Sequence, residues 1–153
     1  MNLFRFLKSS AIKTHLPVRR RGSALMEAAL VFPVLISLTF GSVEFGHFFF
    51  VKHSFQGAAR EGARAGIAPG ASNTDVTTAV GAAMTSAGFP SGQYTVSIRD
   101  AADTSNVNVS SVAAGTSILV KVTASWGTIG IRPLGLIGTS KTVLGQTVMR
   151  KEG

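Results

Sequence analysis

The side chains that could carry chemistry are few and scattered in this chain. There is no cysteine, which excludes disulfides, thiol catalysis and cysteine metal sites. The three histidines, His15, His47 and His53, lack the spacing of metal ligands. The glycines between residues 127 and 138 lack the Gly-Lys-Ser/Thr ending of a phosphate loop. The sequence therefore predicts a protein that is not an enzyme and that holds no cofactor or metal.

Three aspartates could in principle supply carboxylate oxygens to a calcium ion. They are Asp75, Asp100 and Asp103, and none lies in a calcium-binding loop motif. Asp75 follows Ser72 closely, as at a helix start, and the other two lie in a turn-like segment. We favour the helix start and the turn over a calcium site.

Two carboxylates and a histidine interrupt an otherwise apolar run at residues 24–51, where no residue from Ala28 to Val43 is charged. About 20 apolar residues in a helix span a bilayer core, so a transmembrane helix is predicted over residues 23–51. Glu44 and His47 lie one turn apart near its outer end. They could pair, contact a partner helix, or reach the lipid headgroups beside Phe48, Phe49 and Phe50; we favour the headgroups.

The distribution of charge predicts how this helix is oriented. The net charge is +8, and residues 1–22 hold six bases and no acid, which leaves +2 (8 − 6) for the rest. A basic flank stays in the cytoplasm, so residues 1–22 are predicted to be a cytoplasmic leader before a membrane-spanning helix in contact with lipid. The nearly neutral remainder argues against a nucleic-acid partner. A cleaved secretory signal would have a shorter apolar core and a small-x-small site, which is missing here.

The helical pattern continues beyond the membrane over residues 52–68 and ends at Pro69-Gly70, which predicts a helical stalk. Ala58, Gly62 and Gly66 are spaced four apart and share one face. Arg60 and Arg64 lie on a neighbouring face, where Glu61 can pair with Arg64. The small face could pack against partner helices in an assembly or against the protein's own head, and both interpretations stay open.

Residues 69–153 are predicted to form an extracytoplasmic head. A short helix should run from Ser72 to about Ala87, because Gly88 and Pro90 follow it. Alternating apolar residues then predict four antiparallel strands, near residues 94–98, 107–109, 118–122 and 141–149. The fold class is therefore α+β and pilin-like, with one long helix, one short helix and about four strands. A further apolar segment is expected to be core rather than a docking patch: Trp126, Ile129, Ile131, Leu134, Leu136 and Ile137.

Three strings of residues resemble the TadE-like proteins. They are Arg21 to Glu27, Val43-Glu44-Phe45-Gly46, and Ala58-Ala59-Arg60-Glu61-Gly62-Ala63-Arg64-Ala65, within residues 20–66. The resemblance implies a non-enzymatic minor pilin, pseudopilin or assembly factor of the bacterial tight-adherence (Flp) pilus, which mediates cell adhesion. It also implies partners: a prepilin peptidase, other pilins or pseudopilins, and pilus assembly proteins.

The same resemblance assigns roles to the start of the helix. Prepilin processing places Gly before the cut and Glu fifth after it, which corresponds to Gly22, Ser23 and Glu27 in this chain. Glu27 would then pair with the freed amine of a neighbouring subunit and set its axial register. The simpler alternative is that Glu27 only complements the helix N-terminus. The rival function is an unprocessed, membrane-anchored envelope scaffold or ligand-binding protein.

Overall fold

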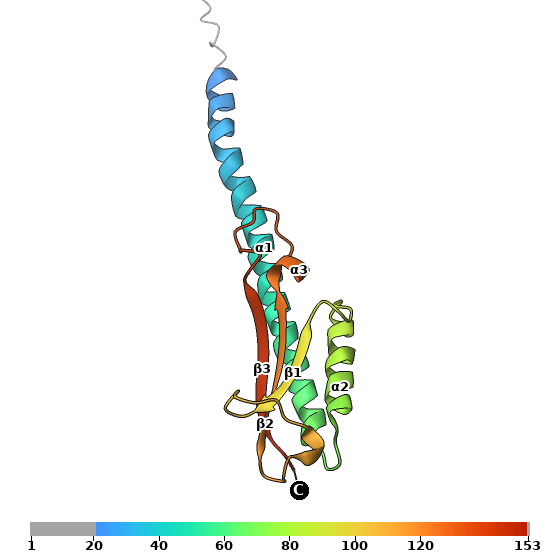
Figure 1. Ribbon diagram of the computed structural model, residues 1–153. Coiled ribbons are helices and arrows are strands. Elements are labelled where there is room, and N and C mark those ends of the chain that lie inside the picture. Colours follow the sequence, from blue (N-terminus) through green and yellow to red (C-terminus); the bar gives the residue numbers. More distant parts are fainter. Residues whose placement is uncertain (1–20, 153) are drawn as a thin grey trace, which may run out of the picture. The chain divides into compact units, whose positions relative to one another are not determined.

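The computed structural model describes residues 21–152. Most of the predicted leader, residues 1–20, therefore lies outside the described residues. The order of elements is α1, α2, β1, η1, β2, α3 and β3 (Figure 1). The described residues divide into two compact units, with the division between Leu35 and Ile36. The second unit contains the later part of α1 and the whole head.

Helix α1 spans Arg21–Ile67, which confirms the single long helix that the sequence predicts. It is continuous because no helix-breaking pair occurs before Pro69-Gly70, and Pro33 is accommodated inside it. Within residues 21–152, this is the one helix long and apolar enough to cross a membrane. Its large apolar side chains between Leu25 and Phe45 are mostly exposed, as expected for a segment whose solvent is lipid.

The head contains an antiparallel sheet of three strands in the order β1-β2-β3. The strands are β1 (Thr95–Asp100), β2 (Ser117–Ser125) and β3 (Thr142–Arg150). The register pairs Asp100 with Ile118 at one end of the sheet and Ser125 with Thr142 at the other. Helix α2 (Asn73–Ser86) precedes the sheet, and the short helix α3 (Trp126–Ile129) follows β2. The α+β class is confirmed.

The predicted fourth strand, at residues 107–109, is wrong. Asn106 makes one isolated bridge to Arg99, and the chain then turns into the short 3-10 helix η1 (Val109–Ser111). The Asn108 side chain accepts hydrogen bonds from the backbone N–H and the hydroxyl of Ser110. Such local side-chain bonds compete with strand pairing, so Asn108 starts a turn where two alternating valines suggested a strand.

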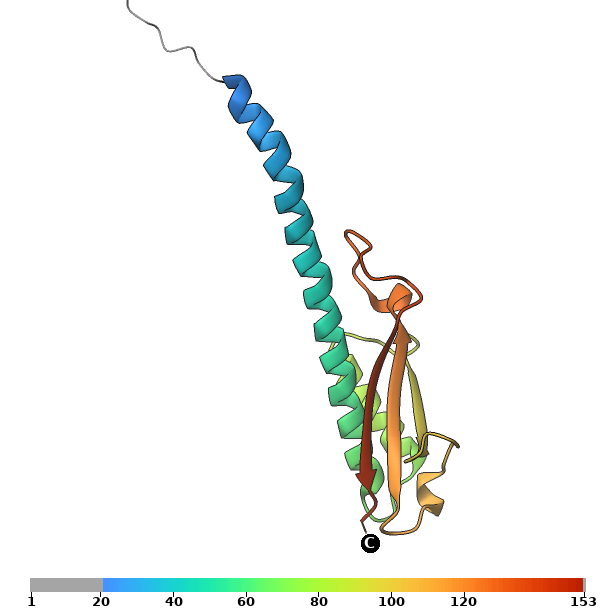
Figure 2. The same cartoon turned by 90° about the vertical axis from the view of Figure 1, so that its left-hand side faces the viewer.

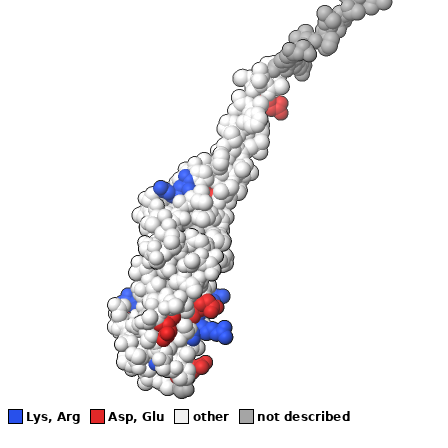
Figure 3. Space-filling view, turned by 90° about the vertical axis from the view of Figure 1, so that its right-hand side faces the viewer, with Lys and Arg blue, Asp and Glu red and all other residues white. Residues whose placement is uncertain are grey.

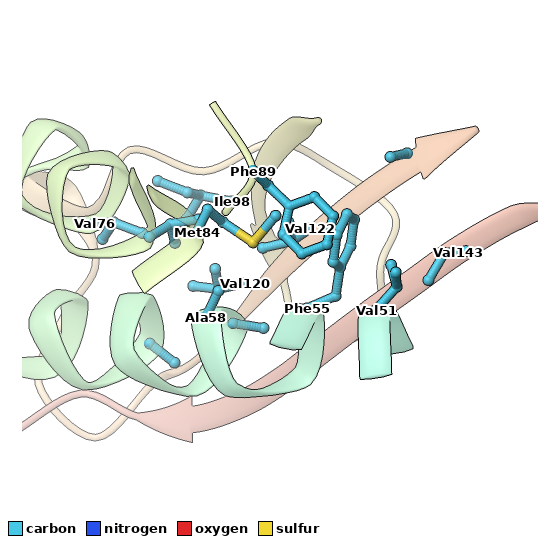
Figure 4. Packing of buried hydrophobic residues seen from close by; sticks show 14 of the residues in the cluster. Val51, Phe55, Ala58, Val76, Met84, Phe89, Ile98, Val120, Val122 and Val143 are labelled. Carbon is cyan, nitrogen blue, oxygen red and sulfur yellow. The ribbon is translucent and has the colours of Figure 1, made fainter. Parts of the chain in front are cut away.

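The hydrophobic core lies between the sheet and the two helices (Figure 4). The later part of α1 contributes Val51, Phe55, Ala58, Ala59 and Ala63, all buried. Helix α2 contributes Val76, Val80 and Met84, and the inward face of β2 contributes Ile118, Val120 and Val122. Alternation along β2 and a helical stripe on α1 therefore meet in one core, which positions residues 36–67 against the head.

Candidate assembly and membrane-interface sites

The predicted processing site lies in the first turn of α1. Gly22 and Ser23 are exposed, and an added Cβ at Gly22 would meet no atom within 4 Å. Glu27 is also exposed, one turn further along. A shallow groove of this unit is lined by Ala24, Glu27, Ala28, Val31, Phe32 and Leu35. Glu27 is the one charged residue of this groove, and the other lining residues are apolar.

Glu44 is fully buried, and the loop that follows α3 covers it. Its carboxylate accepts hydrogen bonds from the backbone N–H of Leu134 at 3.3 Å and of Ile137 at 2.8 Å. Gly135 lies between these residues with a φ of +67°, a left-handed turn that glycine adopts without strain. Consecutive amides turned inward in this way form a concave site for an anion. Glu44 therefore fixes this loop to α1.

His47 contacts the same end of the head. Its Nε2 donates a hydrogen bond to the carbonyl oxygen of Ile129 at 3.2 Å, and its ring centroid lies 5.6 Å from that of Trp126. Trp126 also packs edge-on against Phe48, with a centroid distance of 5.2 Å. Glu44 and His47 thus each bond to the head rather than to one another, a contact that the sequence analysis did not anticipate.

The small-residue face of α1 is occupied by the protein's own head. Ala58, Gly62 and Gly66 are all buried. A Cβ added at Gly66 would lie 2.8 Å from Val76 Cγ2 and 2.9 Å from Ile118 Cδ1, and one at Gly62 would clash with Val80. Glycine at these positions lets α1 approach α2 and β2 closely. Of the two interpretations left open by the sequence, the structure uses this face for packing within the chain.

The charged stalk residues remain at the surface. Arg60, Glu61 and Arg64 are exposed, and none takes part in an ion pair in the described part of the chain. On the face in Figure 3, acidic and basic side chains gather at one end of the head, a smaller basic group lies near the other end, and the surface between them is mostly uncharged. The stalk residues are therefore available to a partner, unlike the small face beside them.

The three aspartates have separate structural roles. Asp75 accepts hydrogen bonds from the N–H and the hydroxyl of Ser72, and these bonds lower the pKa of its carboxyl. Asp100 accepts from the N–H of Ser105 and the hydroxyl of Thr104, which likewise lowers its pKa. Asp103 pairs with Arg99 at 3.0 Å and with Lys121. Among residues 21–152, no group of three acidic, histidine or cysteine side chains is placed to hold a metal ion.

The apolar segment after β2 is divided between core and surface. Trp126 and Ile129 are buried and Ile137 is half-buried, whereas Ile131, Leu134 and Leu136 are exposed. No sequence signal distinguished the two groups. The division follows from Glu44, which holds the backbone of the loop against α1 and leaves these side chains directed away from the core.

Comparison with known proteins gives a family match that lies within α1. A family model described as TadE-like protein matches residues 22–64, which is nearly all of α1. The resemblance inferred from the sequence is thereby confirmed over this segment, which is less than half of the chain. No curated protein and no solved structure matches the chain. One apolar N-terminal helix is consistent with a single-pass membrane anchor in such a protein.

Proposed function

We propose that this chain is a minor pilin, pseudopilin or assembly factor of a tight-adherence pilus and has no catalytic activity. The family match over residues 22–64 carries the proposal. Helix α1 would anchor the protein in the cytoplasmic membrane, with the leader in the cytoplasm and the head outside. The six bases of residues 1–22 support that orientation.

The exposed groove beside Glu27 supports a role in assembly. A prepilin peptidase would cut between Gly22 and Ser23 and create a new amino terminus there. The ammonium of one subunit would then lie against Glu27 of its neighbour, because an unpaired carboxylate is costly near hydrocarbon. Opposite charges attract strongly where water is scarce, so this pair would fix the axial register of packed helices.

The proposed function is tested by an assembly experiment with a matched control. In cells that make the pilus, deletion of this chain should abolish surface filaments, and the unaltered chain should restore them. Glu27→Gln should fail to restore them although the protein still reaches the membrane. Glu152→Gln is the control, since it removes an exposed carboxylate of the head outside the groove. Filaments that persist without the chain would contradict a role in pilus assembly.

A further inference from the structure

An apolar loop at one end of the head has no role in the proposed function. Loop 131–137 presents Ile131, Leu134 and Leu136 to solvent, with 53%, 41% and 57% of each side chain exposed. Clustered apolar side chains on a surface mark a place of contact. The loop extends past the ends of β2 and β3 (Figure 2). Its contact partner must therefore lie at that end of the head.

Contacts with α1 show the level at which this loop lies. Glu44 binds the amides of Leu134 and Ile137, and a Cβ added at Gly41 would lie 3.5 Å from Leu136 Cδ1. The tip of the loop is therefore beside residues 41–44 of the helix. The same stretch of α1 carries exposed Phe40, Val43 and Phe45, so both the loop and the helix present apolar side chains at this level.

The length of the membrane span places this level at the outer edge of the hydrocarbon. A hydrocarbon core of about 30 Å corresponds to about 20 residues of helix at 1.5 Å per residue. Counted from Ala24, just after the basic leader, such a span ends near Val43. Glu44 then lies at the outer hydrocarbon boundary. The loop that it holds lies at the same depth, where apolar side chains are stable and a carboxylate needs hydrogen-bond donors.

Three cations lie at this end of the head, namely Arg132 within the loop, Lys52 and Lys141, and all three are exposed. A surface groove at the same end of the sheet is lined by Phe48, Lys52, Lys141, Thr142, Val143 and Leu144. Lys52 is eight residues beyond Glu44, about 12 Å along the helix axis. A lysine side chain can extend back from that position towards phosphate while its methylenes cover apolar residues. Positive charge beside an apolar tip is the pattern of a surface that binds anionic membranes.

We propose that loop 131–137 is a second membrane contact of this protein. Its apolar side chains enter the outer boundary of the bilayer, and Arg132, Lys52 and Lys141 bind the phosphate oxygens of phospholipid headgroups. A single helix leaves the head free to rotate about its axis. A second contact held by Glu44 removes that freedom and sets one face of the head towards the membrane. This inference requires the membrane anchor and not the pilus assignment.

Depth-dependent quenching in vesicles tests the proposal directly, because the chain has no cysteine of its own. The full chain with Leu136→Cys, labelled with a small fluorophore, is reconstituted with lipids that carry a nitroxide near the acyl boundary. Val43→Cys on α1 is the positive control, and Ala102→Cys at the opposite end of the sheet is the negative one. Ile131→Cys repeats the measurement in case Leu136→Cys disturbs the loop.

The loop probes should be quenched about as strongly as the probe at Val43, and the probe at Ala102 should be unaffected. Glu44→Gln should reduce quenching at Leu136 and leave it unchanged at Val43. Loop probes that behave like Ala102 would overturn the proposal. Loop probes shielded from aqueous iodide but not reached by the nitroxide lipid would also overturn it, because a protein would then cover the loop.

The role of the lysines is tested by changing the lipid charge. Quenching at Leu136 should be stronger in vesicles with phosphatidylglycerol than with phosphatidylcholine alone. The double variant Lys52→Gln, Lys141→Gln should lose part of that difference, because Arg132 keeps its charge. Arg60→Gln with Arg64→Gln removes the same charge further along α1 and should keep it. If both double variants lose the lipid-dependent difference in quenching equally, the effect comes from net charge at a distance. That result would contradict phosphate binding by the lysines.

Discussion

At the scale of single residues, Gly145 shows how tightly α1 and β3 approach each other. It is buried in β3, and a Cβ added there would clash with the backbone of Phe55 and Gln56. Backbone atoms cannot move aside as a flexible side chain can. The Gln56 side chain reinforces this approach, since its amide donates to the carbonyl oxygen of Gln146 at 2.7 Å.

Gly145→Ala should therefore lower the free energy of unfolding by about 1–3 kcal/mol, the usual cost of overpacking. Gly57→Ala is the matched control on α1, where an added Cβ meets no atom within 4 Å. It should stabilise the helix by up to about 1 kcal/mol. Denaturant unfolding of the full chain in detergent measures both. Equal midpoints for the two variants would contradict the close approach.

Ser72 and Asp75 form a reciprocal cap at the start of α2. Hydrogen bonds from Ser72 lower the pKa of Asp75 in the folded protein below its ordinary value of 3.8. A lowered folded-state pKa contributes stability that is complete above the unfolded value and is lost as the pH falls through the lowered one. Asp75→Asn should therefore be less stable than the parent at neutral pH and lose less stability on acidification.

Ser72→Ala removes the hydroxyl but keeps the backbone N–H that lowers the pKa of Asp75 most, so it should reduce the acid dependence only in part. Loss of the cap should cost about 1 kcal/mol at neutral pH. Thr78→Ala, at an exposed position within α2, is the control and should keep the parent's dependence. Thermal midpoints between neutral pH and pH ~3 follow all three variants. An unchanged acid slope in both cap variants would show that this carboxylate is not coupled to folding.

At the scale of elements, the sequence predicted those features that depend on residues close together in the chain. The apolar run, Pro69-Gly70 and the Ser72 cap together indicated α1 and α2 nearly to their ends. The pairing of Glu44 with the loop joins residues 90 and 93 positions apart in the chain. No periodicity connects such distant positions, so Glu44 was assigned to the headgroup region rather than to a loop of the head.

Glu44→Gln should loosen loop 131–137 without unfolding the head. An amide side chain keeps one acceptor oxygen but loses the charge that strengthens bonds from backbone N–H groups. Hydrogen exchange followed by mass spectrometry should show faster exchange for a peptide that contains Leu134 and Ile137, and unchanged exchange in β2. Glu61→Gln serves as the control. Unaltered protection of the loop peptide would contradict its attachment to Glu44.

At the scale of the whole molecule, the class of fold could be predicted because it depends on the pattern of apolar residues along helices and strands. The sequence alone indicates one long helix, which spans 47 residues in the structure, and strands in which apolar residues tend to alternate. The strand count failed at residues 107–109, where one asparagine side chain redirected the backbone. The roles proposed for Gly22, Ser23 and Glu27 involve other proteins, so these roles remain predictions.

The proposed topology predicts which side of the membrane the head occupies. Ala102→Cys should react with a membrane-impermeant maleimide in intact spheroplasts. Leu30→Cys, within the predicted span, should stay unreactive even after the membrane is opened, because lipid excludes the reagent. Reaction of Ala102→Cys only after lysis would place the head in the cytoplasm and reverse the orientation expected from the six leader bases.

The amino-terminal residue of the protein isolated from cells tests the central claim most directly. Mass spectrometry of the intact chain should give a product that begins at Ser23 and lacks residues 1–22. Gly22→Val should block that cut, whereas Gly46→Val, which also lies in α1 with open space around it, should leave it unchanged. A mature chain that still begins at Met1 in pilus-forming cells would contradict processing as a prepilin.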